Sequence, residues 1–99
     1  MAQFDCYRRK GGEGFWVDCQ AEVLASLDTR FVVPLLPLNL APIPAAHLNP
    51  LFEIEGAAHS FLAQFAGTIP VAELGGWAGS LESERYRIGN ALDFLLTGV

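Results

Sequence analysis

Very few side chains in this sequence have the types and spacing that catalysis needs. A nucleophilic triad requires a serine or cysteine, a base and an orienting group, and the only imidazole bases are His47 and His59. His47 lies in a proline-rich segment and His59 lies beside small residues, with no recognisable motif around either. There is no G-x-S-x-G elbow, phosphate-binding glycine loop or H-E-x-x-H pair. We therefore interpret both histidines as structural or solvated and assign no catalytic residue.

Charged side chains allow two weaker hypotheses. Asp18 and Glu22 could form a carboxylate pair, although they lie on a predicted strand and just beyond it. Arg30 could be the cation of a ribonuclease, with Asp18 or His59 as its acid or base. We expect instead that Arg30 begins a strand and pairs with a carboxylate.

The two cysteines, Cys6 and Cys19, predict no metal site. They do not form a C-x-x-C pair and have no histidine at ligand spacing, so we expect neither zinc nor a cofactor. Both lie in apolar, strand-like stretches, where a free cysteine behaves as a small core residue. The segment MAQFDCYRR has no apolar signal core, and no stretch approaches the length of a membrane span. These features predict a cytoplasmic protein with reduced thiols and no membrane association.

Composition points to one domain that works by binding protein. The 99 residues fit a single domain, residues 1–99, and 52% of them are apolar while only 17% are charged. With so few charges some apolar residues must lie on the surface, which favours association, including a homo-oligomer. The net charge of −5 disfavours direct nucleic-acid binding and favours a basic partner. The one basic run, Arg8-Arg9-Lys10, lies in a glycine-rich loop, which we interpret as solvated.

Alternation of apolar and polar residues predicts β-structure in the first third of the chain. Residues 3–7 and 15–20 have the period of half-buried strands, with RRKGGEG between them as the turn of a hairpin. In the second strand Phe15, Val17 and Cys19 share one face. The run RFVVPLL, residues 30–36, predicts a buried strand, in which Pro34 marks an edge or a bulge.

The middle of the chain is rich in proline. Residues 37–50 contain four prolines, so neither a helix nor a sheet ladder continues through them. We expect an ordered apolar loop that covers one end of the sheet, with its leucines and Ile43 packed. The segments LFEIE and TIPVAEL, residues 51–55 and 68–74, predict strands. Between them, AAHSFLAQFAG fits helical spacing and strand alternation equally well.

The clearest pattern predicts an amphipathic C-terminal helix. Ser80 or Ser83 can cap its start, where Glu82 and Glu84 suit the positive end of the helix dipole. Gly89 would let another backbone approach closely. The apolar stripe has the spacing i, i+3, i+4, i+7, i+8 and consists of Ile88, Ala91, Leu92, Leu95 and Leu96.

The whole chain resembles the CcdB toxins, the toxin halves of CcdA–CcdB toxin–antitoxin modules. The resemblance is carried by "QF", "FWVDCQAE", "RFVVPL", "LNP", "TIPV" and "ALDFLLTGV", in this order and at matching spacing. It implies a mainly β fold with one C-terminal α-helix, an SH3-like barrel of the CcdB/MazF/Kid type, and a homodimer. It also places the ambiguous segment AAHSFLAQFAG largely in a strand.

The same resemblance implies a function without enzymatic activity. CcdB toxins bind the A subunit of DNA gyrase and trap the complex in which gyrase has cut DNA. A CcdA-like antitoxin neutralises them with a flexible segment, and the two proteins together repress their own operon. DNA would then be contacted only through the antitoxin or gyrase, in a module that serves plasmid maintenance.

The resemblance also implies which residues contact gyrase. The last three residues, Thr97, Gly98 and Val99, match the residues needed for poisoning, with Val99 supplying an apolar contact and a terminal carboxylate. Leu96 and Asp93 match further contact positions on the helix, and so do Val23 and Leu24 in the segment after DCQAE. The best-known members carry a tryptophan in place of Thr97, and a tryptophan face can stack on an arginine in a way that threonine cannot.

An acidic or amphipathic antitoxin segment would seek the basic run Arg8, Arg9 and Lys10 and fold as it binds. Two alternatives stay open on the sequence. One is a MazF/Kid-like endoribonuclease toxin that uses Arg30. The other is a CcdB homologue that has lost its toxicity, as the Thr97 departure suggests, and only binds antitoxin.

Overall fold

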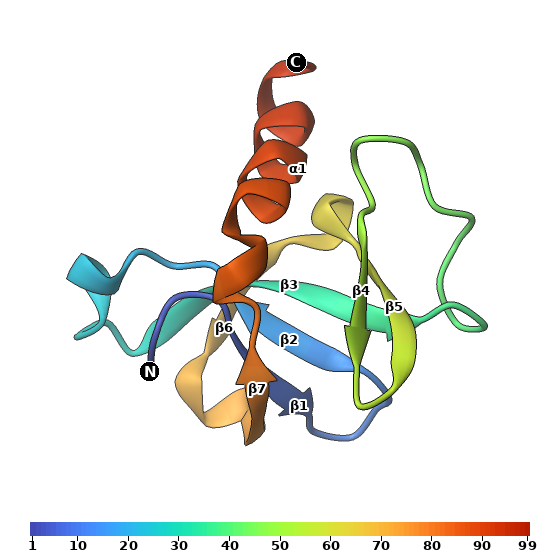
Figure 1. The fold of residues 1–99 in the computed structure, drawn as a ribbon. Coiled ribbons are helices and arrows are strands. Elements are labelled where there is room, and N and C mark those ends of the chain that lie inside the picture. Colours follow the sequence, from blue (N-terminus) through green and yellow to red (C-terminus); the bar gives the residue numbers. More distant parts are fainter.

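Seven strands form one strongly curved antiparallel sheet, and a single α-helix stands on it (Figure 1). The computed structural model describes all residues, Met1–Val99. The helix α1 spans Arg85–Thr97, and it is neither long nor apolar enough to cross a membrane. The strands are β1 (Asp5–Arg9), β2 (Phe15–Asp18), β3 (Thr29–Pro37), β4 (Leu51–Ile54), β5 (Ala57–Phe61), β6 (Gly67–Pro70) and β7 (Leu74–Ser80). Single 3₁₀ turns lie at η1 (Glu22–Leu24), η2 (Ala63–Phe65), η3 (Val71–Glu73) and η4 (Glu82–Glu84).

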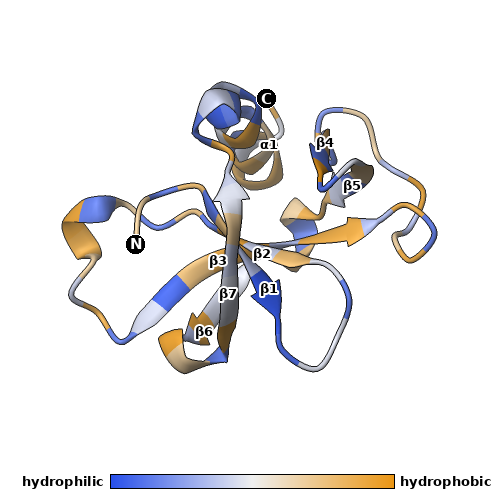
Figure 2. Ribbon diagram, turned by 60° about the horizontal axis from the view of Figure 1, so that its bottom comes forward, coloured by the Kyte–Doolittle hydropathy of each residue, from blue (hydrophilic) through white to orange (hydrophobic).

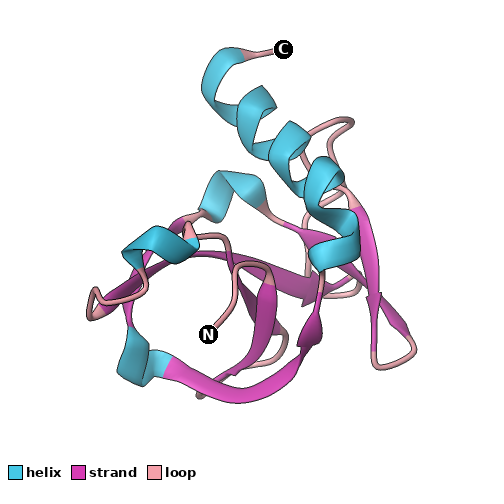
Figure 3. Ribbon diagram, turned by 60° about the vertical axis from the view of Figure 1, so that its left-hand side comes forward, coloured by secondary structure: helices cyan, strands magenta, loops and turns pink.

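The sheet curls because its central strand, β3, changes partner half-way along one side. The strand order is β4-β5-β3-β2-β1-β7, and β6 also pairs with β3. On that side β3 pairs with β6 over residues 29–32 and with β5 over residues 35–37. The result is the half-barrel visible in Figure 3.

Pro34 lies where β3 changes partner. The sequence predicted an edge or a bulge, but β3 is an interior strand. The carbonyl of Pro34 accepts a hydrogen bond from the N–H of Leu62, so it points to the side of β3 where β5 and β6 lie. In an antiparallel strand the N and the C=O of one residue point to the same side. The missing N–H therefore falls in the gap between β6 and β5, where the ladder loses no bond.

The expected N-terminal hairpin is present, but its strands are not simply half-buried. Arg8 and Arg9 lie in β1 rather than in the loop, and the turn is confined to residues 10–14. Phe15 and Val17 face the main core as predicted, yet Asp18 and Gln20 on the other face are also buried. Because the sheet curls round this second face, its polar residues are covered as well.

The core lies between the sheet and the first half of α1. Ile88 and Ala91 are fully buried against Val33, Leu35 and other sheet residues. Burial of a large aliphatic side chain contributes about 1.5–3 kcal/mol, so these contacts hold α1 upright. Leu92 is only partly buried, and Leu95 and Leu96 are exposed. The apolar stripe predicted from the sequence is thus covered only over its first two turns.

The start of α1 is capped differently from the prediction. The hydroxyl of Ser80 accepts the amide of Glu82, so it caps the 3₁₀ turn η4 that leads into α1. Ser83 makes no capping bond, and the side chain of Glu84, the residue directly before α1, makes none either. No backbone approaches Gly89 within the chain, because an added Cβ there would meet open space.

The segments around the middle of the chain fulfil the predictions in part. AAHSFLAQFAG begins as strand β5, as the family resemblance implied, and continues as the 3₁₀ turn η2. TIPVAEL starts in β6 but leaves the sheet at η3. The strand that follows, β7, was not predicted, because its sequence LGGWAGS contains three glycines and has no apolar alternation.

The proline-rich loop does not cover an end of the sheet. It rises beside α1 (Figure 1), and Leu38, Leu40 and Ile43 are exposed, Ile43 to 92%. Its packed anchors are Leu48 and the buried Asn49, whose amide bonds to Phe61 O and to the Gln64 side chain. The prediction of an apolar cover was therefore wrong, because polar bonds at one end hold the loop.

Arg30 lies at the start of β3, directly after its first residue, and pairs with a carboxylate as predicted. Its Nε lies 3.8 Å from Oδ2 of Asp18, and both side chains are at least 95% buried. The guanidinium also donates to Ala25 O at 2.9 Å. The backbone N–H of Gln20 donates to Oδ1 of Asp18. Burial raises the pKa of Asp18, while the Gln20 bond and Arg30 oppose that rise. Burial and the carboxylates of Asp5 and Asp18 raise the pKa of Tyr7 to about 12.

Arg30→Ala should lower the free energy of unfolding by about 3 kcal/mol at neutral pH, because it leaves the Asp18 carboxylate buried without its cation. The raised pKa of Asp18 favours its protonated form in the folded state, so the loss should shrink as pH falls towards about 4. Urea denaturation at several pH values measures this. The matched control is Arg85→Ala, which removes an exposed pair with Glu82 and should cost less than about 1 kcal/mol. Equal losses in the two variants would contradict the prediction.

The cysteines should be unreactive in the native protein. Both are free and buried, and burial raises the pKa of Cys6 to about 12 and raises that of Cys19 as well. Since the thiolate is the reactive form, a thiol reagent at pH 8 should label neither residue until denaturant is added. Rapid labelling of the folded protein would show that the core opens locally.

Candidate functional site

The structure does not assemble the catalytic groups considered from the sequence. His59 is buried, with Nδ1 2.8 Å from Ala57 O and its ring edge-on to Phe15. The Glu22 carboxylate accepts a hydrogen bond from the backbone N–H of Gln3 and does not pair with Asp18, which contacts Arg30. No cluster of three or more potential metal ligands is formed.

The C-terminal end of α1 instead presents five of the predicted contact residues together. Leu96 and Val99 are 79% and 90% exposed, and Asp93, Thr97 and Gly98 are exposed beside them. We call this set, Asp93 and Leu96–Val99, the C-terminal surface. It projects away from the sheet because the core ends one turn earlier (Figure 1). Two large apolar side chains are held in water without an intramolecular partner, which is typical of an interaction surface.

Local bonds fix the shape of the C-terminal surface. Gly98 has φ +76°, the left-handed conformation that ends a helix, and its amide donates to Phe94 O at 2.8 Å. The Thr97 hydroxyl donates to Asp93 O at 2.8 Å. Its proton is therefore used within the helix, and the methyl group of Thr97 is the part offered to a partner.

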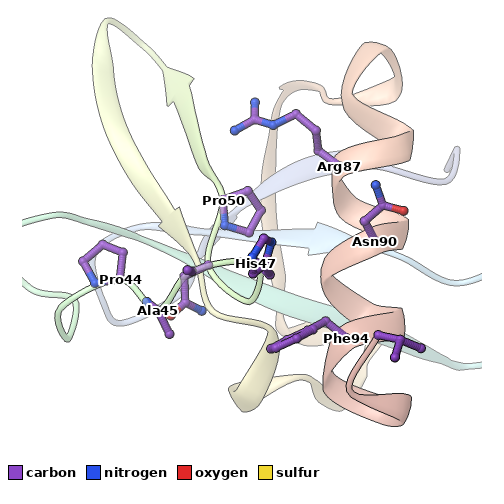
Figure 4. Close-up of a pocket in the computed structure, with 10 residues that line it drawn as sticks. Pro44, Ala45, His47, Pro50, Arg87, Asn90 and Phe94 are labelled. Carbon is purple, nitrogen blue, oxygen red and sulfur yellow. Dashed lines mark hydrogen bonds between the residues drawn. The ribbon is translucent and has the colours of Figure 1, made fainter.

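A pocket of about 630 Å³ adjoins this surface, between α1 and the proline-rich loop (Figure 4). Val99 belongs both to the C-terminal surface and to the lining of this pocket. The helix contributes Arg87, Asn90 and Phe94, and the loop contributes Pro44, Ala45, Ala46, His47, Asn49 and Pro50. The walls are mainly apolar, with amide and guanidinium donors towards the start of the helix. No pattern in the sequence predicts this pocket, because the loop meets the helix only in the tertiary structure.

His47 narrows the pocket. Its φ of +67° is unusual for a residue other than glycine, and its ring centroid lies 5.6 Å from that of Phe94. The prediction that His47 is structural or solvated agrees with this position on the exposed loop.

Val23 and Leu24 lie in η1, away from the C-terminal end of α1 in both Figure 1 and Figure 3. Both are exposed, Val23 to 87%, and Figure 2 shows the hydrophobic character of this projecting turn. Within one chain they form a second apolar surface and do not extend the C-terminal surface.

The basic run is partly occupied by contacts within the chain. Arg8 forms an ion pair with Glu55, Arg9 stacks 4.8 Å from the ring centroid of Trp16, and Lys10 donates to Ala72 O at 2.7 Å. Arg8 and Arg9 also line a pocket of about 330 Å³, which we call the hairpin pocket. Its other lining residues are Gly12, Glu13, Gly14, Phe15, Pro37, Ala57 and His59.

Solved structures show the class of fold to which the chain belongs. Two mycobacterial endoribonucleases, one of them in complex with its cognate antitoxin, match with TM-scores of 0.77 and 0.76 at 16% and 15% identity. The matches cover 97% of this chain, and 94% and 90% of theirs. The Mycobacterium tuberculosis toxin MazF-mt6 matches with a TM-score of 0.75 at 15% identity, over 93% of this chain and 94% of the toxin. The fold is thus the half-barrel with a C-terminal helix that MazF-type toxins have.

The sequence assigns the chain to a family within this class. The model of the CcdB protein family matches residues 3–98, so the protein belongs to the CcdB family of toxin–antitoxin toxins. A search of curated protein sequences gives no match.

Alanine in place of Gly89, inside α1, and of Gly98, at its C-terminal end, should change the free energy of unfolding in opposite directions. Gly98→Ala should lower the free energy of unfolding by about 1 kcal/mol, because alanine disfavours φ +76°. Gly89→Ala should raise it by about 0.5–1 kcal/mol, because Gly89 is inside the helix and an added Cβ meets open space. Chemical denaturation measures both changes. A destabilised Gly89→Ala variant whose loss depends on protein concentration would contradict this and place that helix face in an interface between copies.

Proposed function

We propose that this protein is the toxin of a type II toxin–antitoxin module and that it binds the A subunit of DNA gyrase and traps the gyrase–DNA cleavage complex. The observation that carries the proposal is the C-terminal surface, where Leu96 and Val99 are exposed at the C-terminal end of α1 in a chain without an assembled catalytic site. A poison of this kind needs no chemistry of its own. It needs only a surface that fits one state of its target better than the others.

The C-terminal surface has suitable properties for such binding. Leu96 and Val99 supply apolar contact area, and Asp93 offers a carboxylate on the same end of α1. The pocket beside Val99 can receive a side chain of the partner against Phe94. Thr97 offers a methyl group where well-known members have a tryptophan, so its contact with gyrase is smaller and the neighbouring apolar residues carry more of the affinity.

Val23 and Leu24 complete the proposed gyrase contact if the protein is a homodimer. They lie apart from the C-terminal surface within one chain, and a second copy can bring one chain's η1 near the other's helix end. We further propose a cytoplasmic location and autoregulation of the operon with the antitoxin.

The proposed partner for neutralisation is a CcdA-like antitoxin with a flexible acidic segment. It would bind at Arg8, Arg9 and Lys10, where a protein of net charge −5 concentrates three of its six lysines and arginines. Antitoxin binding is the one property that the non-toxic homologue would share with an active toxin.

The second candidate is an endoribonuclease, and one contact favours it: Arg30 meets the carboxylate of Asp18. Both side chains are at least 95% buried, however, and His59 is bonded to Ala57 O rather than to this pair. An RNA 2′-hydroxyl would have to displace protein to reach them. The geometry therefore supports the gyrase poison better.

Removal of Thr97, Gly98 and Val99 should abolish gyrase poisoning without unfolding the protein, since all three are exposed and their hydrogen bonds lie within the last turn of α1. The measurement incubates the purified protein with gyrase, supercoiled plasmid and ATP, followed by denaturation and protease. Linear DNA should form with the full-length protein and disappear with the truncated one. Tyr86→Ala is the matched control, because it removes an 81% exposed aromatic residue from the other end of the same helix.

Linear DNA at full level from the truncated protein would refute the C-terminal surface as the poisoning site. No linear DNA from the folded full-length protein would refute the gyrase proposal. An RNA cleavage gel with Arg30→Ala as its control then separates a ribonuclease from a homologue that only binds antitoxin.

A further inference from the structure

The ion pair between Arg8 and Glu55 occupies a cation that the proposed antitoxin would need. Both Nη atoms of Arg8 donate to the two carboxylate oxygens of Glu55, a fork-to-fork arrangement. The side chains are 53% and 50% exposed, so the pair lies in water at the rim of the hairpin pocket. The guanidinium is thus already held in the geometry that binds a carboxylate, but with a carboxylate of the same chain.

Glu55 is an unexpected residue for its place in the backbone. It has φ +52° and is followed by Gly56 with φ +80°, and together they form the two-residue turn between β4 and β5. Turns with two positive φ values favour asparagine, aspartate or glycine at the first position. A glutamate is disfavoured there by backbone conformation, so the turn geometry does not explain its presence, whereas its contact with Arg8 does.

The hairpin pocket has the charge and lining that an acidic segment needs. The guanidinium groups of Arg8 and Arg9 line it, against the single carboxylate of Glu13. Phe15, Pro37 and Ala57 give it an apolar floor, and Arg8 lies 5.6 Å from the Phe15 ring centroid. Such a site fits a peptide that alternates carboxylates with apolar side chains.

We propose that Glu55 is a built-in competitor, which an acidic side chain of the antitoxin displaces from Arg8 when the antitoxin segment enters the hairpin pocket. The inference rests on the antitoxin site proposed above and concerns its regulation. Glu55 keeps Arg8 oriented and neutralised in the free toxin, so it lowers affinity for other acidic chains. It also sets the affinity that the antitoxin must exceed.

The test measures binding of a short acetylated and amidated peptide of glutamates with interspersed leucines, by NMR titration of the full-length protein. Glu55→Gln should bind it about threefold more tightly than the wild type, the size of effect expected from an exposed ion pair. Arg8→Ala should bind it more weakly. The same peptide with glutamine in place of glutamate should not distinguish the variants.

Glu53→Gln is the matched control. Glu53 is exposed on β4, two residues from Glu55, and makes no ion pair. It changes the net charge by the same amount, so it reports the long-range effect of charge alone. A second readout follows the Glu55 carboxyl directly: the Arg8 hydrogen bond lowers its pKa, and saturating peptide should return that pKa towards its ordinary value.

Tighter binding by Glu55→Gln but not by Glu53→Gln, with the pKa change, supports the inference. Equal effects of the two substitutions, or an unchanged Glu55 pKa, overturn it while leaving the antitoxin site in place. Unchanged binding by Arg8→Ala overturns the antitoxin site at the hairpin and the competitor with it. If neither the wild type nor Glu55→Gln binds the peptide, the antitoxin site at the hairpin and the competitor are likewise overturned.

Discussion

The architecture depends on one strand, β3, and on its change of partner at Pro34. Along one side β3 pairs with β6 and then with β5, and along the other with β2. The missing amide of Pro34 falls in the gap between two partners, so the strand can serve both without an unsatisfied donor. Because β5 and β6 diverge from there, the sheet curls into a half-barrel. The curl covers the second face of the sheet, where the Arg30–Asp18 pair is buried.

The extent of the core decides which part of α1 is available to a partner. Ile88 and Ala91 dock the first turns of the helix on the sheet, and the side chains beyond Leu92 reach past its edge. Leu95, Leu96 and Val99 are therefore exposed for a structural reason and not through loose packing. Because the N-terminal half of α1 is packed on the core, its exposed C-terminal end is already ordered. Binding there therefore costs little additional conformational entropy.

Four of the six cations of the protein form ion pairs, which limits where an anionic partner can bind. Arg85 and Arg87 at the start of α1 pair with glutamates of the preceding turn η4, Arg30 is buried with Asp18, and Arg8 pairs with Glu55. Arg9 lies over the Trp16 ring and donates to Glu13 O. A partner that approaches the hairpin thus competes with contacts inside the chain, whereas one that approaches the C-terminal surface competes only with water.

The sequence by itself determined that the chain is mainly β-strand with one C-terminal helix. Alternation predicted the first hairpin, a continuous apolar run predicted β3, and the 3.6-residue repeat predicted α1, because these patterns follow from local backbone geometry. Residue order over the full chain indicated the CcdB family. Pairing decided the rest: β7 forms because Gly75 fits against the backbone of Arg8, where a Cβ would clash at 2.5 Å. Likewise, only the packed structure decided that Ile43 stays exposed, that Val99 borders a pocket and that Arg8 meets Glu55, 47 residues away. Such contacts depend on how distant segments meet, and no local pattern encodes that.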